Sequence, residues 1–113
     1  MPAAIRVALP ADVPALVAID LAVSPSPWSA SQFLGACEHG GRGGEFALVL
    51  EQAAVLRGFI VCQQVLDELH IHNVAVAPPA QRRGYARQLL KAALARATPG
   101  HCLLEVRASN AAA

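Results

Sequence analysis

One segment, residues 73–90, constrains the fold of this chain more than any other. It opens with the apolar run Asn-Val-Ala-Val, passes through two prolines, and continues as a helix-forming stretch. The spacing of its apolar residues changes from a strand pattern to a helix pattern on the way. We therefore expect a strand, a tight loop and a helix, with the sequence Gln-Arg-Arg-Gly-Tyr-Ala at the opening turn of the helix.

This opening turn has the features of a pyrophosphate site. The first backbone N–H groups of a helix lack intrahelical partners, and with the helix dipole they favour an anion on the helix axis. Gly84 lets a phosphate approach the main chain, and Ala86 keeps the next turn small. Arg82, Arg83 and Arg87 add charges suited to phosphate oxygens. The alternative is an ordinary amphipathic helix with a glycine near its start. The flanking sequence decides between this alternative and a phosphate site.

The rest of the chain predicts one small α/β domain. Its 113 residues are 55% hydrophobic, which is enough apolar material for a single core. Strands are expected over residues 5–9, 46–50, 55–66, 69–76 and 102–108. Helices are expected to begin at Asp12, at Ser29 or Ser31, and at Arg82, with Trp28 as a hydrophobic staple. The last strand should pair in parallel with the fourth through a right-handed crossover.

Composition excludes several classes of function. The net charge is only +1, and the basic residues gather mainly around one helix start, so we expect no nucleic-acid partner. No apolar run has the length of a membrane span, and no leader pattern is present, which favours a cytoplasmic protein. Cys37, Cys62 and Cys102 lack paired spacing and fit reduced thiols. Two histidines without a third ligand, His70 and His72, give no metal site.

A second segment supports the pyrophosphate interpretation. One helix after the phosphate loop, residues 103–110 form a strand pattern that ends in Ser-Asn. Together the two segments resemble the GNAT superfamily of acetyl-CoA-dependent N-acetyltransferases. Pro27, Trp28 and Ser29 followed by Phe33, and Gln-Val-Leu-Asp-Glu over residues 64–68, are similar to the bacterial ribosomal-protein-alanine N-acetyltransferases. The resemblance covers nearly the whole chain and implies a GNAT-like mixed sheet with flanking helices.

The resemblance implies direct attack of a protein N-terminal amine on acetyl-CoA, with the alanine of a ribosomal protein as the expected acceptor. Glu105 matches the general base of the family, and the alternative is a surface carboxylate paired with Arg107. Asn110 matches a cofactor-binding asparagine and can also cap a following helix. Tyr85 is expected to pack or to contact adenine.

Backbone groups of the fourth strand are expected to hold the pantetheine arm, namely those of Val74, Ala75 and Val76. We assign Trp28, His70 and His72 to the acceptor groove. With Glu68, the histidines alternate onto one strand face and offer a substitute base. The alternative is a structural role, which is more common for histidines in strands.

In the family, another helix with a catalytic tyrosine and two more strands follow the Ser-Asn step. This sequence ends at Ala113, so we expect one domain over residues 1–113 that lacks those elements. An exposed edge strand over residues 102–113 would favour a homodimer, and acetyl transfer would be weak. A non-catalytic CoA-binding remnant and a small-molecule N-acetyltransferase are the alternatives.

Overall fold

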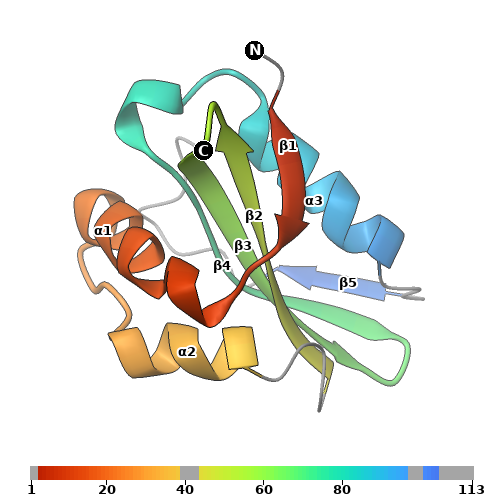
Figure 1. Ribbon diagram of the computed structural model, residues 1–113. Helices are drawn as coiled ribbons and strands as arrows, with labels where there is room; N and C mark the ends of the chain where they lie inside the picture. Colours follow the sequence, from red (N-terminus) through yellow and green to blue (C-terminus); the bar gives the residue numbers. More distant parts are fainter. Residues whose placement is uncertain (1–2, 39–43, 97–100, 105–113) are drawn as a thin grey trace.

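The computed structural model describes residues 3–38 and 44–96, and the backbone of residues 101–104. The strands of its one sheet are β1 (Ala4–Val7), β2 (Glu45–Gln52), β3 (Val55–Val65), β4 (Glu68–Val76) and β5 (His101–Leu104). The helices are α1 (Val13–Val23), α2 (Ala30–Glu38) and α3 (Tyr85–Arg96), with 3₁₀ turns η1 (Pro10–Asp12) and η3 (Pro78–Ala80). The sheet order is β1-β2-β3-β4-β5, antiparallel except for the parallel β4–β5 pair (Figure 1). The expected mixed α/β sheet with flanking helices is confirmed.

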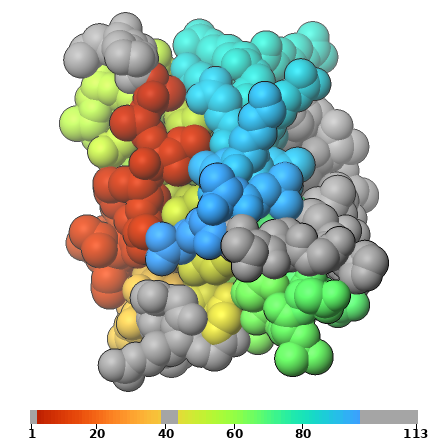
Figure 2. Space-filling model, turned by 90° about the vertical axis from the view of Figure 1, so that its right-hand side faces the viewer, coloured from red at the N-terminus to blue at the C-terminus, as the bar shows by residue number. Residues whose placement is uncertain are grey.

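Two apolar layers cover the two faces of the sheet. Successive side chains of β2 and β3 point alternately into one layer and the other, because neighbours in a strand point to opposite faces. Ala47, Val49, Phe59 and Val61 pack with α1 and α2, whereas Phe46, Leu48, Leu50 and Ile60 pack with α3. Figure 2 shows α3, in blue, lying across its face between the red N-terminal segment and the green end of the β3–β4 hairpin.

Ser29 caps the start of α2, which settles the choice between Ser29 and Ser31. The Gln32 backbone N–H donates to Ser29 Oγ at 3.3 Å, and the Ser29 N–H donates to Gln32 Oε1 at 2.8 Å. This reciprocal pair is a capping box. The Trp28 ring lies 5.3 Å from the Phe33 ring, so the predicted hydrophobic staple is confirmed.

Two helix starts differ from expectation. Asp12 makes no side-chain cap of α1, since its carboxylate instead accepts the Leu9 N–H at 2.7 Å within η1. The third helix begins at Tyr85 rather than Arg82, because Arg82 and Gly84 have φ angles of 67° and 77°. A left-handed backbone cannot be part of a right-handed helix. Of the predicted fifth strand, only the part up to Leu104 falls within the described residues.

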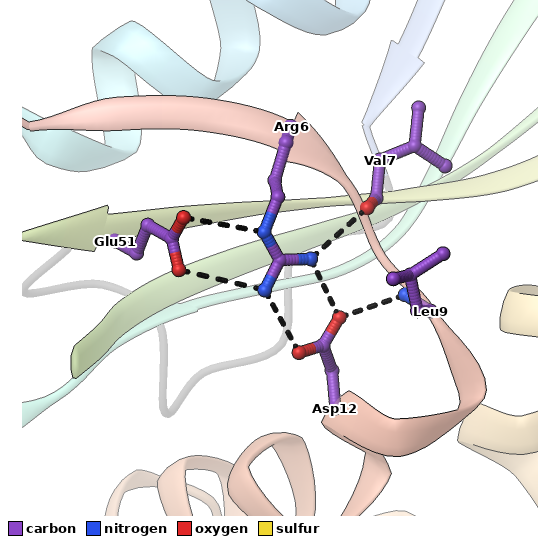
Figure 3. Close-up of polar contacts among 5 residues, drawn as sticks. All are labelled: Arg6, Val7, Leu9, Asp12 and Glu51. Atoms are coloured by element: carbon purple, nitrogen blue, oxygen red, sulfur yellow. Dashed lines mark hydrogen bonds and ion pairs between the residues drawn. The ribbon is translucent and has the colours of Figure 1, made fainter. Parts of the chain in front are cut away.

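An ion-pair cluster connects β1, η1 and β2 at the start of the fold (Figure 3). Arg6 donates from Nη1 and Nη2 to the two oxygens of Asp12 at 2.8 and 3.0 Å, and from Nε to Glu51 Oε1 at 3.3 Å. The hydrogen bonds from Arg6 lower the pKa of Asp12 below its ordinary value, because they favour the ionised carboxylate.

We expect Asp12→Asn to lower the free energy of unfolding at neutral pH by about 1–3 kcal/mol, because the charged pair is lost. A carboxyl whose pKa is lowered by folding stabilises the protein above its unfolded pKa of 3.8, and this contribution disappears as the pH falls through the folded pKa. In urea unfolding experiments, the free energies of unfolding of the variant and the parent should therefore become equal as the pH is lowered through the acidic range. Asp67→Asn, in the exposed β3–β4 turn, is the control. A stability difference that does not change with pH would contradict the assignment.

Candidate functional site

β4 pairs with β3 along its length and with β5 over its first residues. The β4–β5 pairing is described from Glu68 to Ile71, up to the last described residue of β5, and β4 is paired with β3 as far as Val76. The last part of β4 contains the three residues predicted to offer backbone groups to a pantetheine arm, Val74, Ala75 and Val76.

A β-bulge interrupts the pairing of β4 with β3. Cys62 pairs with Ile71, and Val61 pairs with Asn73, so His72 is an extra residue in β4. The bulge reverses which residues face which layer: Leu69, Ile71, Val74 and Val76 pack on the α3 side, whereas Ala75 packs on the α1–α2 side. Bulges of this kind redirect side chains and are frequent next to active sites.

The segment that follows β4 is held against the strand. The side-chain amide of Gln81 donates to Val76 O at 3.1 Å, and the N–H of Ala80 donates to Ala77 O at 2.8 Å. Two left-handed residues, Arg82 and Gly84, then turn the chain into α3. A Cβ added at Gly84 would meet no heavy atom within 4 Å, so the main chain is open to a ligand there.

The start of α3 presents free hydrogen-bond donors. The N–H of Gln88 donates to Gly84 O at 3.0 Å and makes the first bond of the helix. The N–H groups of Tyr85, Ala86 and Arg87 precede this bond and therefore have no acceptor inside the helix. They form the type of site that binds an anion.

Three arginines surround these donors. Arg82, Arg83 and Arg87 are all exposed, and none of them forms an ion pair with another residue in the described ranges. Figure 2 shows η3 and the first turn of α3, in cyan, on the surface at one end of the α3 face. The sequence prediction of a positively charged, open helix start agrees with this arrangement.

Tyr85, unlike the three arginines around it, has a buried side chain. Its side chain is buried in the core under α3, and its hydroxyl donates to Gln52 Oε1 at 3.4 Å. Of the two expected uses, packing is the one observed, and a contact with a cofactor would come from the backbone N–H. Ala86 is partly buried against the same core.

The predicted acceptor residues form two groups. Glu68 Oε1 lies 3.1 Å from His70 Nε2, and the His70 ring meets the His72 ring edge-on with centroids 6.5 Å apart. The structure therefore brings these three β4 residues together. Trp28 belongs to the second group, since its backbone N–H donates to Asp20 Oδ2 at 2.7 Å.

Sequence analysis missed Asp20 and Asn73, which are both fully buried. The side-chain amide of Asn73 donates to Asp20 Oδ2 at 3.4 Å, so Asp20 joins the Trp28 loop to β4. A signal was present in the sequence: Val13, Leu16 and Asp20 follow helical spacing, which places a carboxylate in the buried stripe of α1.

Glu105 and Asn110 lie outside the described residues, so their assigned roles stay predictions. Among the residues that the structure describes, no three His, Cys, Asp or Glu side chains are grouped to hold a metal ion. None of the helices in that part of the chain has the length and apolar character needed to cross a membrane.

Gly84→Val should weaken CoA binding by more than tenfold, equivalent to about 1.4 kcal/mol. The new side chain would occupy the open space at the helix start, and the left-handed backbone would be strained. Calorimetric titration with CoA measures the effect. Gly35→Ala in α2 is the matched control, because its Cβ also meets no atom within 4 Å but lies away from α3. Unchanged CoA affinity in a folded Gly84→Val protein would refute the site.

Comparisons with known proteins agree with this geometry. Residues 13–113 match the model of the acetyltransferase (GNAT) family. The [ribosomal protein bS18]-alanine N-acetyltransferases of Salmonella typhimurium and Escherichia coli K12 are each 39% identical to this chain, over 90% of it and 68% of their own length.

Solved structures give the same result. The crystal structure of the ribosomal-protein-S18-alanine N-acetyltransferase from Escherichia coli superposes with a TM-score of 0.80 and 32% identity, covering 98% of this chain and 71% of that one. An N-acetyltransferase from Thermoplasma acidophilum in complex with coenzyme A is 16% identical, with a TM-score of 0.78 over 98% of this chain and 83% of its own, and it supports the fold alone. On the family match and the 39% identity, the chain belongs to the GNAT family of acetyl-CoA-dependent N-acetyltransferases.

Proposed function

We propose that this protein transfers the acetyl group of acetyl-CoA to the N-terminal alanine of a ribosomal protein of the bS18 type. The observation that carries the cofactor half of this proposal is the start of α3, where the N–H groups of residues 85–87 precede the first helix bond and directly follow the loop that Gln81 anchors on β4. The acceptor half rests on the relatives that are 39% identical and are named for this reaction.

The geometry suggests how the cofactor would lie. The pyrophosphate would bind the N–H groups at residues 85–87, with Arg82, Arg83 and Arg87 around it. The pantetheine arm would then run along β4 from Val76 back toward His72, a distance of about 13 Å at the usual rise of a strand. This path places the thioester beside the bulge, and Asn110 would add a further cofactor contact.

The reaction forms one amide bond and breaks one thioester bond. The neutral amine attacks the thioester carbonyl, the amine loses a proton, and the CoA thiolate departs and is protonated. A peptide α-amine has an ordinary pKa near ~8, so a modest base is sufficient. We assign this base to Glu105, and a backbone N–H of the segment from Val74 to Val76 to the oxyanion.

The acceptor would enter on the α1–α2 side of the sheet. Leu69 and Ile71 pack on the α3 side, so the alternating residues Glu68, His70 and His72 point away from that layer. Both histidines are partly buried, as expected for residues that line a groove. We assign them and Trp28 to contacts with the acceptor peptide.

Two other assignments are also proposals. We place the protein in the cytoplasm, where the thiols of Cys37 and Cys62, which form no disulfide with each other, would remain reduced. Pairing of two copies through β5 is a prediction that light scattering would test, with a monomer at all concentrations as the contrary result.

Acetyl transfer to a synthetic alanine-initiated peptide tests the proposed function. Glu105→Gln should reduce kcat by about 10²-fold or more, with CoA affinity unchanged. The loss should be partly recovered at high pH, where the amine deprotonates without help. Glu38→Gln, which removes an exposed carboxylate at the end of α2, is the control.

Full activity of Glu105→Gln at neutral pH would remove Glu105 from the mechanism. Glu68→Gln and His70→Asn would then identify whether the β4 pair supplies the base. A parent protein that binds CoA but acetylates no peptide would favour the non-catalytic alternative.

A further inference from the structure

Asp20 is a buried carboxylate in the middle of α1. Its side chain has no solvent exposure, and Oδ2 accepts hydrogen bonds from the backbone N–H of Trp28 at 2.7 Å and from the amide of Asn73 at 3.4 Å. Burying a carboxylate is costly unless its partners are well placed, and aspartates are rarely buried completely. The hydrogen bonds of a fully buried carboxylate must therefore offset the free-energy cost of its burial.

Trp28 and Asn73, which both donate to Asp20 Oδ2, lie at the two sides of the proposed acceptor groove. Trp28 is the residue before the α2 cap, where its ring packs on Phe33. Asn73 directly follows the bulged residue His72, 53 positions from Asp20 in the sequence. One carboxylate oxygen therefore connects the α1–α2 loop with β4 directly after its bulge.

The loop itself has local hydrogen bonds that do not reach the sheet. The Ser24 N–H donates to Asp20 O at 2.8 Å and ends α1, and the Ser26 N–H donates to Ser24 Oγ at 3.2 Å. These bonds shape the loop but do not connect it to β4. The Trp28 ring packs on the core cluster that includes Ala75 of β4, and the Asp20 carboxylate adds a directional polar connection to the strand.

We propose that Asp20 is a positioning residue for the acceptor amine, because it holds the α1–α2 loop against the β4 bulge. The inference rests on the proposed function and adds a determinant of acceptor binding to it. Asp20 does not touch the reacting atoms and uses no proton. Its effect is geometric, since a displacement of the groove wall by about 1 Å is enough to impair the attack of an oriented amine.

The cofactor site should be insensitive to this connection. It is built from the loop after Val76 and the start of α3, whose packing lies on the opposite face of the sheet. A change at Asp20 should therefore alter the KM for the peptide and leave the Kd for CoA within about twofold, a split that a purely structural residue would not produce.

The decisive experiment compares Asp20→Ala with Asp20→Asn on an alanine-initiated peptide. Asp20→Ala removes the acceptor of both hydrogen bonds and should raise the KM for the peptide by about tenfold or more. Asp20→Asn should restore most of the loss, because its amide oxygen, in the place of Oδ2, can accept both the Trp28 N–H and the Asn73 side-chain amide.

Asn73→Ala breaks only the β4 end of the connection and should raise the KM in the same direction. Combined with Asp20→Ala it should add little, since residues of one hydrogen-bond network are not additive. Ser24→Ala is the matched control, because it removes a hydrogen bond of the same loop that does not reach β4, and its KM should equal that of the parent.

Trp28 provides a readout without turnover, as the chain contains one tryptophan. Its fluorescence should become more accessible to acrylamide in Asp20→Ala and Asn73→Ala but not in Ser24→Ala. If Asp20→Ala does not fold, Asn73→Ala decides the question by the same two measurements.

A folded Asp20→Ala protein with the KM and Trp28 accessibility of the parent would overturn the proposal. So would an Asp20→Asn protein as impaired as Asp20→Ala, which would show that the charge itself is required. If the parent acetylates no alanine peptide, the proposed function fails. In that case the Trp28 measurements alone still support or overturn the role of Asp20 in holding the loop.

Discussion

The single extra residue in β4 is the constraint on which the rest of the site depends. A regular strand would send Asn73 to the same face as Ile71, into the apolar layer beneath α3. With His72 inserted, Asn73 instead reaches Asp20 on the α1 side, and Val74 takes the place on the α3 side. Before the bulge, the odd-numbered residues of β4 face the α3 layer, and after it the even-numbered residues do. The bulge thus reverses which residues of the strand face each layer.

This change of phase separates the two proposed ligands. Before the bulge, His70 and Glu68 turn away from the α3 layer, where an acceptor would lie. After the bulge, β4 leads into the loop at Gln81 and the helix start at Gly84, where an anion would lie. The two proposed binding regions share a strand but draw their other residues from opposite faces of the sheet.

Much of the fold could be predicted from the sequence, because the governing signals are local. The capping box at Ser29 and Gln32 and the staple at Trp28 involve neighbouring residues, and both are confirmed. The bulge could not be predicted, since His72 becomes an extra residue only when β3 pairs with β4 in this register. Alternation within β4 alone gives no sign of it.

Other differences also come from long-range contacts. Arg82 has no local reason to adopt a left-handed backbone, and the later start of α3 reflects the η3 turn that Gln81 anchors on β4. Tyr85 is the first residue of α3, and its burial follows from the packing of α3 over β2. For the site, the arginines and Gly84 were predicted from sequence, whereas the Asp20–Asn73 contact depends on the assembled fold.

The basic residues of the chain are concentrated at the proposed cofactor end of β4. Three of the nine lysine and arginine residues lie within residues 82–87, although the net charge of the whole chain is only +1. The bulge at His72, beside which the proposed path puts the thioester and the attacking amine, lies about 13 Å from the end of β4 by strand rise. At physiological ionic strength a charge is screened beyond about 8 Å, so the arginines would attract the anionic cofactor without repelling a cationic N-terminus that approaches the bulge. On the proposed function, a near-neutral protein would thus hold two ligands of opposite charge along a single strand.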